Sequence, residues 1–166
     1  IANTLFYARQ IRPETILHIV LDGPSDPPKT LRFESDTLGN LGGFDERTLC
    51  RAIQTALHAS RNLGSGKEVR TEEGISVVKR GFEPLIQEKC GISPVYYLNR
   101  KGSDIRTTIF EASATFVFTD HLSMPKKTDK YLNRLGAIPV NVGPKTLFAS
   151  QCIVLVHNEL DRQGIP

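Results

Sequence analysis

The sequence lacks any apolar run close to the roughly 20 residues that a membrane-spanning helix needs. It also lacks a signal-peptide pattern, so we expect a cytoplasmic protein with no membrane partner. Cysteine is scarce: the three cysteines are widely spaced, and neither a Cys-x-x-Cys pair nor a Cys/His cluster with zinc spacing occurs. These spacings predict reduced thiols and no metal site.

Several common nucleotide-binding and hydrolase motifs are missing as well. No G-x-G-x-x-G follows an expected strand, and no G-x-S-x-G elbow is present, so neither a dinucleotide-binding fold nor an α/β-hydrolase has support. The segment 64–67 (GSGK) resembles the end of a phosphate-binding loop. Glu68, however, replaces the required Ser or Thr, and Arg61 occupies the position of the first Gly. The phosphate-loop interpretation therefore fails.

What is present fits a globular chain of one domain. The 166 residues are 39% hydrophobic and 23% charged, which is ordinary for a protein with a buried core. The net charge of +3 is compatible with an RNA partner, although many proteins with no nucleic-acid role share it. The chain begins at Ile1, and segment 1–10 has the pattern of the middle of a helix, so we expect a further piece upstream.

Apolar and helical patterns alternate along the chain, which predicts an α/β fold with a largely parallel sheet. Strands are expected at 15–21, 29–33, 75–78, 95–98, 115–118 and 138–141. Helices are expected at 45–62 with Asp45 as N-cap, at 81–89 with an interruption at Pro84, and from Pro125 to Gly136. The run 152–156 fits either a strand or a buried helix, and periodicity does not decide between them.

Two strand ends are candidate binding loops, because ligands of open α/β sheets bind where loops leave the carboxyl ends of strands. They are segment 118–121 (FTDH) and segment 142–144 (VGP). Gly143 lets backbone approach a ligand closely, and Pro144 stiffens the turn. The alternative is that 142–144 is only a tight connection.

Seven segments together resemble one family: PSDPPKTLRF, LGGFDERTL, KRGFEPLI, GSDIR, FVFTDH, LGAIPVNVGPKTL and CIVLVHNELDR. The resemblance is to the TrmY family, the archaeal tRNA pseudouridine-54 N1-methyltransferases and their bacterial relatives, and it extends from about Asn3 to Arg162. It is most specific at 152–162 and at the 142–144 turn before it.

The resemblance implies one SPOUT-class methyltransferase domain over residues 1–166, without the family's first N-terminal strand. Such a domain has helices on both faces of its sheet and a C-terminal trefoil knot, an exception to the rule that chains do not thread. The implied cofactor is S-adenosyl-L-methionine, the methyl donor, and the implied assembly is a homodimer with the active site at the subunit contact. Segment 152–156 then becomes an interface helix. Carried over by position, the donor-binding residues are Phe118, Thr119, Val142, Gly143, Pro144, and, within 147–154, Leu147, Cys152, Ile153 and Val154.

One departure concerns the first loop, where the family commonly has Leu-Gly-Asp-His and this chain has Phe-Thr-Asp-His. Thr119 replaces a glycine at a position where backbone meets ligand.

The implied reaction transfers a methyl group from a cationic sulfonium to N1 of a pseudouridine, in RNA that the resemblance identifies as tRNA. The N1 proton needs a base, and Asp104 and Asp120 are the candidate catalytic carboxylates. Both also suit structural roles, Asp104 in a turn and Asp120 as a helix cap. Arg80 and Arg106 are candidates for RNA phosphate contacts. Two alternatives stay open: methylation of another RNA base, such as one in rRNA, and RNA binding without catalysis.

Overall fold

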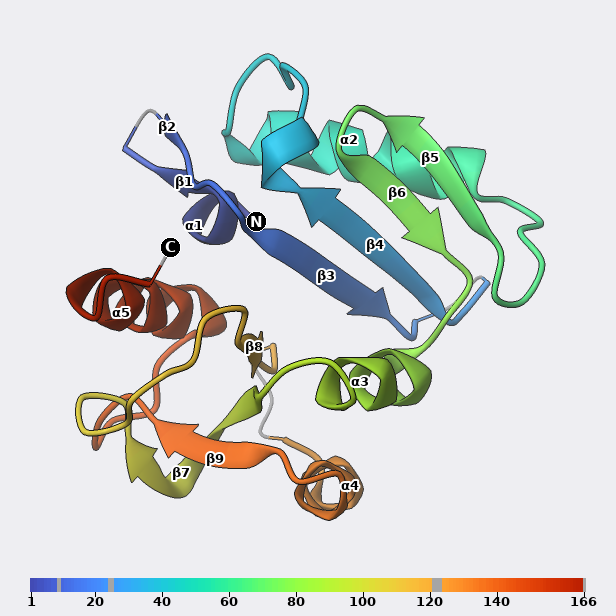
Figure 1. Cartoon of the computed structure of the whole chain (residues 1–166). Helices are drawn as coiled ribbons and strands as arrows, with labels where there is room; N and C mark the ends of the chain where they lie inside the picture. The colour runs from blue at the N-terminus through green and yellow to red at the C-terminus, as the bar shows by residue number, and fades with distance from the viewer. Residues whose placement is uncertain (9, 24–25, 121–123, 166) are drawn as a thin grey trace. The chain divides into compact units, whose positions relative to one another are not determined.

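A computed structural model describes residues 1–8, 10–23, 26–120 and 124–165. The chain forms two compact units, Ile1–Leu85 and Ile86–Pro166, which Figure 1 draws in blue to green and in green to red. Within the described ranges, no helix is both long and apolar enough to cross a membrane.

The N-terminal unit is built on a four-stranded antiparallel sheet. Its order is β3 (Ile16–Leu21), β4 (Lys29–Glu34), β6 (Ile75–Val78) and β5 (Glu68–Glu72). Helix α2 (Glu46–Ala59) packs on one face, where Ala52 and Ala56 meet the buried side chains of Leu31, Phe33, Ile75 and Val77. Asp45 is the N-cap of α2, as predicted, because its Oδ1 accepts a hydrogen bond from the Thr48 amide at 3.1 Å.

The first residues differ from their predicted helical pattern. Helix α1 (Ala2–Leu5) has only four residues and is followed by the short antiparallel pair β1 (Phe6–Tyr7) and β2 (Gln10–Ile11). Ala8 adopts a φ of 51°, which is incompatible with continuing the helix. A 3-10 turn, η1 (Ser35–Thr37), follows β4.

The C-terminal unit contains a three-stranded parallel sheet in the order β8 (Thr115–Val117), β7 (Val95–Asp104) and β9 (Ile138–Asn141). Its helices are α4 (Lys126–Arg134) and α5 (Ala149–Arg162), and α3 (Phe82–Cys90) spans the boundary between the units. Successive residues of β7 point to opposite faces of the sheet. Tyr96 packs with Val156 of α5, whereas the Tyr97 hydroxyl accepts a hydrogen bond from Asn133 of α4 at 2.8 Å. The two helices therefore cover opposite faces.

The prediction of a largely parallel sheet is correct only for the C-terminal unit. In the N-terminal unit the connections 22–28 and 73–74 are too short for a crossover, so the strands that they join run antiparallel. The structure also corrects one predicted helix and settles the state of segment 152–156.

Helix α3 is continuous through Pro84, although an interruption was predicted there. Pro84 lies in the first turn of the helix, where a missing amide hydrogen costs nothing. Segment 152–156 lies inside α5, so the open choice between strand and helix is decided for helix.

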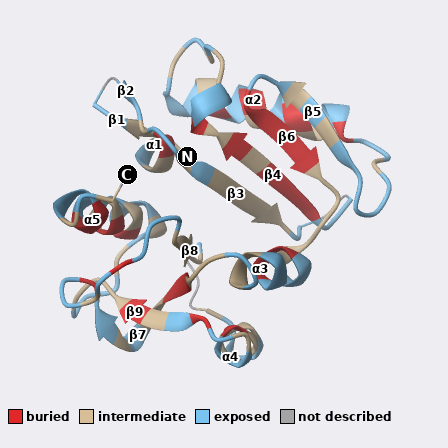
Figure 2. Ribbon diagram, viewed as in Figure 1, coloured by how far each residue is buried: buried red, intermediate tan, exposed pale blue. Residues whose placement is uncertain are grey.

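Strand β7 carries a bulge that the sequence did not indicate. Leu98 and Ser103 both align with Val140 of β9, so residues 99–102 protrude from the ladder. Gly102 lies directly on the backbone of Pro139 and Val140, where no Cβ would fit. Figure 2 shows buried residues on β7, on α5 and at one position of β9, Val140, and these strands and helix form the core of this unit.

Candidate active site

Three parallel strands point their carboxyl ends toward one edge of the C-terminal sheet (Figure 1). β8 ends at Val117, β7 at Asp104 and β9 at Asn141. The chain after each end carries predicted site residues: Phe118, Thr119 and Asp120 after β8, Arg106 after β7, and Val142, Gly143 and Pro144 after β9. This is the edge at which parallel α/β sheets bind their ligands.

The 142–144 turn has the open backbone that a ligand-binding loop requires. Gly143 adopts a φ of 131°, a conformation that favours glycine. A Cβ added there would meet no atom within 4 Å, so the space beside this backbone is empty. The Gly143 amide donates a hydrogen bond to Oδ1 of Asn141 at 3.1 Å, which fixes the turn.

Asn141 joins this turn to the end of β7. Its Nδ2 donates to the carbonyl of Gly102 in the bulge, and its backbone carbonyl accepts from the Ile105 amide at 3.0 Å. Asn141 is also the β9 partner of Asp104 in the ladder. Sequence reasoning missed this residue, although an amide side chain directly before Val-Gly-Pro is a signal for a side-chain-closed turn.

The segments after β8 and β9 meet on one hydrophobic cluster. Phe118 and Val142 both pack against a core that contains Val140 and Val156. Thr119 is half-buried beside Phe118, and Asp120 is exposed. His121, the last residue of the predicted first loop, lies outside the described residues.

The predicted donor residues at the start of α5 differ in their burial. Cys152 is buried, its Sγ lies 3.9 Å from the carbonyl oxygen of Leu147, and burial raises the pKa of its thiol. A protonated thiol is a packing group rather than a nucleophile. Ile153 is half-buried, whereas Val154 is 49% exposed.

Asp104 closes the turn that follows β7. Its Oδ1 accepts a hydrogen bond from the Arg106 amide at 2.9 Å, and its carbonyl accepts from the Thr107 amide at 3.0 Å. The structural role considered for Asp104 is therefore present, and the side chain remains exposed at the carboxyl edge.

The two predicted RNA-binding arginines belong to different units. Arg106 is exposed in the C-terminal unit. Arg80 is half-buried in the N-terminal unit, where its carbonyl accepts a hydrogen bond from the Thr30 hydroxyl at 2.7 Å. Across the described part of the chain, no group of three or more His, Cys, Asp and Glu side chains is arranged to hold a metal ion.

A parallel sheet with loops converging at its carboxyl edge, followed by a helix that closes the same core, is an α/β arrangement built to bind a ligand at that edge. The chain belongs to the family whose model, described as "Putative SAM-dependent RNA methyltransferase", matches residues 1–165. It is thus an S-adenosylmethionine-dependent RNA methyltransferase, and the predicted family resemblance, enzyme class and cofactor are confirmed.

Curated relatives match nearly the whole chain. Two proteins, each named "Putative pseudouridine methyltransferase", come from Photobacterium profundum and Shewanella frigidimarina. They are 42% and 43% identical over 159 residues, which is 96% of this chain and 80% of each relative. A crystal structure of Archaeoglobus fulgidus Nep1 bound to S-adenosylhomocysteine matches with a TM-score of 0.54 at 14% identity. That match covers 82% of this chain and 58% of the Nep1 chain, and it supports the SPOUT-like fold.

The residues at the carboxyl edge fit this donor. S-adenosylmethionine has an apolar-faced adenine ring and a polar, charged amino-acid end. Phe118 and Val142 offer a partly buried apolar surface, and the open backbone at Gly143 leaves room for close approach. The Thr119 hydroxyl adds a polar group where the family commonly has glycine.

Proposed function

We propose that the chain methylates N1 of a pseudouridine in RNA, and that this RNA is tRNA. The pseudouridine methyltransferase names of its relatives, at 42% and 43% identity, support the target base. Pseudouridine is joined to the sugar through carbon, so its N1 carries a removable proton, whereas N1 of uridine is already bonded to the sugar. Methylation of a different RNA base is the outcome that would replace this proposal.

The observation that carries the proposal is the convergence of the β8, β7 and β9 ends at one edge of the C-terminal sheet. When bound, S-adenosylmethionine supplies a methyl group on a cationic sulfonium. The protein then has to hold N1 and the methyl in line and exclude water, which can account for much of the rate enhancement. Phe118, Val142 and the Gly143 backbone hold the donor, together with Thr119, Pro144, Leu147 and the 152–154 segment.

The N1 proton requires an acceptor at the same edge, and Asp104 and Asp120 are the proposed bases. Asp104 uses one carboxylate oxygen in its turn, which also fixes the direction of the side chain. Replacing the base by Asn should lower kcat while donor affinity stays unchanged, because the donor loops are untouched. Arg80 and Arg106 are proposed to hold RNA phosphates.

The architecture carries further proposals. The SPOUT-like fold supports a C-terminal trefoil knot in one methyltransferase domain, and the family resemblance supports a cytoplasmic homodimer with the active site at the subunit contact. In such a dimer, the exposed side of α5 would face the second subunit.

The test is methyl transfer to matched transcripts with and without pseudouridine, followed by nucleoside mass spectrometry. We expect methyl transfer only to the pseudouridine transcript, with the product identified as N1-methylpseudouridine. Equal transfer to both transcripts would refute pseudouridine N1 as the target. Comparing tRNA and rRNA from a deletion strain then identifies the RNA.

A further inference from the structure

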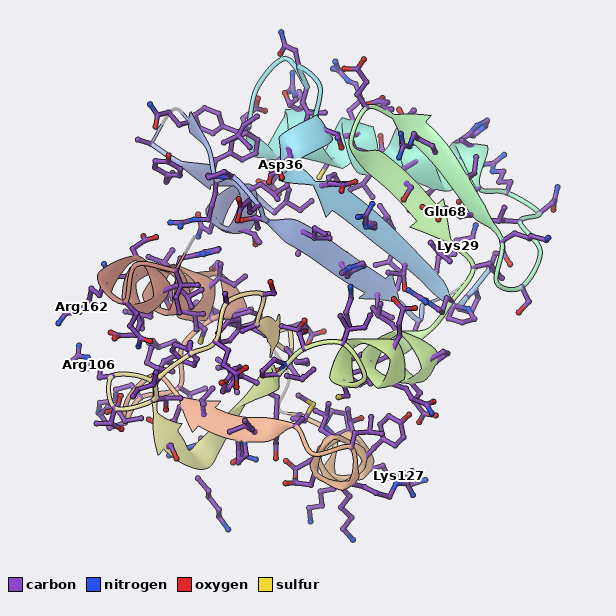
Figure 3. All side chains as sticks on the ribbon, in the orientation of Figure 1. Lys29, Asp36, Glu68, Arg106, Lys127 and Arg162 are labelled. Atoms are coloured by element: carbon purple, nitrogen blue, oxygen red, sulfur yellow. The ribbon has the colours of Figure 1, made fainter. Side chains whose placement is uncertain are left out.

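A cavity of about 460 Å³ lies in the C-terminal unit, beside the segment that leaves β7. One wall is formed by residues 106–110, and the other by Glu159, Gln163 and Ile165 at the end of α5 and just beyond it. Figure 3 labels Arg106 and Arg162 at this end of the unit. No part of this cavity belongs to the donor-binding residues described above.

Glu159 is a buried carboxylate in the wall of the cavity, with 9% of its surface exposed. Its Oε1 accepts a hydrogen bond from Gln163 Nε2 at 3.1 Å. Its Oε2 forms an ion pair with Arg162, whose Nε lies 3.6 Å away, beyond hydrogen-bond distance, and the Arg162 side chain is 72% exposed. A buried carboxylate is costly unless its oxygens accept hydrogen bonds. The ion pair with Arg162 is too long for a hydrogen bond, so Oε2 can still accept a hydrogen bond from a donor group that enters the cavity.

Gln163 holds the two walls together. Its Oε1 accepts from the Phe110 amide at 3.0 Å, and its Nε2 donates to the Thr108 carbonyl at 2.9 Å and to Glu159. Both Nε2 hydrogens and the oxygen of Gln163 thus bond within the protein, and they fix the Glu159 carboxylate against the 108–110 segment. A carboxylate held in one orientation is preorganised for a ligand.

The rim of the cavity suits a nucleotide. Arg106 supplies an exposed guanidinium, a group that matches the geometry of phosphate. The buried acceptor and the exposed cation together select a ligand that has an N–H group at one end and a phosphate at the other. A nucleotide of RNA with a ring N–H has this chemistry.

The cavity and the donor loops follow neighbouring strands of the same sheet. Its 106–110 wall follows β7, the central strand, while the donor loops follow the flanking strands β8 and β9. Phe110 and Leu160 belong to the same hydrophobic cluster as Phe118 and Val142. The cavity and the donor loops therefore share one core and one edge of the sheet.

We propose that this cavity receives the target base of the RNA, with Glu159 accepting the ring N3–H of a uracil-type base and Arg106 binding an adjacent phosphate. Recognition at N3 leaves N1, on the other side of the C2 carbonyl, open to methylation. Adenine and cytosine have no ring N–H at neutral pH and are disfavoured. Gln163 is a positioning residue that acts through Glu159. The inference rests on the proposed function for its RNA substrate.

The test measures binding and needs no methyl transfer. The probes are stem–loop RNAs that carry one uridine, one pseudouridine or one N3-methylated uridine in the loop, titrated in the presence of S-adenosylhomocysteine. We expect the first two RNAs to bind the wild-type protein equally, because both have an N3–H, and the N3-methylated RNA to bind about tenfold more weakly. Glu159→Gln should bind all three alike, at the weaker level, with S-adenosylhomocysteine affinity unchanged.

The matched control is Glu111→Gln, an exposed carboxylate outside the cavity lining, which should retain the preference for N3–H. Arg106→Ala should weaken the binding of all three RNAs and make their affinity less dependent on salt concentration. If the wild-type protein binds the N3-methylated RNA as well as the others, the base site is not this cavity, whatever the folding of the variants. A retained N3–H preference in Glu159→Gln overturns the role of Glu159. Failure of methyl transfer alone would instead count against the proposed function.

Discussion

At Gly143 the backbone conformation and the empty space beside it make opposite demands on a side chain. A Cβ would have room, but a φ of 131° is strained for any other residue, and the side chain would occupy the space proposed for the donor. We expect Gly143→Val to weaken S-adenosylmethionine binding at least about tenfold. Isothermal titration calorimetry measures this directly.

A second glycine provides the control. Gly66 has a φ of 70°, equally open surroundings and a position in the N-terminal unit. Gly66→Val also introduces backbone strain at a positive φ and should leave donor affinity unchanged. A similar loss of S-adenosylmethionine affinity in both variants would mean that Gly143→Val acts through backbone strain and not by blocking a binding site.

Asn141 should influence donor binding without touching the donor. Replacing it by Ala removes the acceptor for the Gly143 amide, and we expect donor affinity to fall about tenfold. Asn141→Asp keeps that acceptor but places a carboxylate oxygen against the Gly102 carbonyl oxygen, so it should retain more affinity than Asn141→Ala but less than wild type. Donor affinity and KM for S-adenosylmethionine are the measurements.

The control for Asn141 is Asn133, whose amide bridges α4 to the Tyr97 hydroxyl away from the carboxyl edge. Asn133→Ala should lower thermal stability and spare donor affinity. Equal donor affinity in Asn141→Ala and wild type would contradict the positioning role.

At the residue scale, the 142–144 turn could be predicted from the sequence, but the hydrogen bonds of Asn141 that stabilise it could not. Gly143 was recognisable because a glycine directly after an apolar strand is typical of a tight turn with an open backbone. Asn141 and Gln163 act through hydrogen bonds to carbonyl and amide groups of distant segments, and those partners become neighbours only in the folded chain. The roles of individual site residues remain predictions.

At the scale of elements, the β7 bulge depends on Gly102. A Cβ at this position would fall on the backbone of Pro139 and Val140, which cannot move as a flexible side chain can. We expect Gly102→Ala to destabilise the protein by about 1–3 kcal/mol, the cost of overpacking. Urea denaturation measures the change. Gly64→Ala, where the nearest atom is Lys67 Cγ at 3.6 Å, should have a much smaller effect.

Helix α2 should show a pH-dependent cap. Hydrogen bonds from the Thr48 hydroxyl and amide hold the pKa of Asp45 below its ordinary value. A lowered folded-state pKa means that the stabilisation is present above the unfolded-state pKa and is lost as the pH falls through the folded-state pKa. Asp45→Ala should therefore lower the melting temperature at neutral pH, and the difference from wild type should shrink in acid.

Asp45→Asn is the control for charge, because Asn caps helices without ionising. Its melting temperature should stay close to wild type at neutral pH. A difference between wild type and Asp45→Ala that is constant down to strongly acidic pH would contradict the role of the ionised side chain.

Most of the elements themselves were predictable, and the exceptions have physical reasons. Apolar runs such as 75–78 and 138–141 were read correctly as strands because their β-branched residues favour strands. Strand β5, with the sequence EVRTE, was missed because it lies at the edge of its sheet and alternates with charged residues. The strands of the N-terminal unit were predicted to be parallel but are antiparallel. Hydrophobic periodicity indicates which residues are buried, but it does not indicate which strands pair or in which direction they run.

At the scale of the whole molecule, two apolar side chains at the start of α5 remain uncovered. Phe148 is 69% exposed and Val154 is 49% exposed. We expect them to pack in a homodimer, since exposed apolar groups on a helix often mark a subunit contact. Light scattering at micromolar concentration should give the mass of two chains, and Val154→Glu should give one. A monomeric wild-type protein would contradict the proposed assembly.

Helix α5 sets a limit on how the family can diverge. Cys152, at the proposed donor site, and Glu159, at the cavity, are both buried and lie two turns apart on one face, separated by about 10 Å of rise. A single inserted or deleted residue between them would rotate Glu159 by about 100° and carry it out of its wall. Substitutions in this interval can be absorbed one at a time, but a change of length cannot. Sequence alignments of active family members should therefore contain no insertion or deletion between the positions of Cys152 and Glu159.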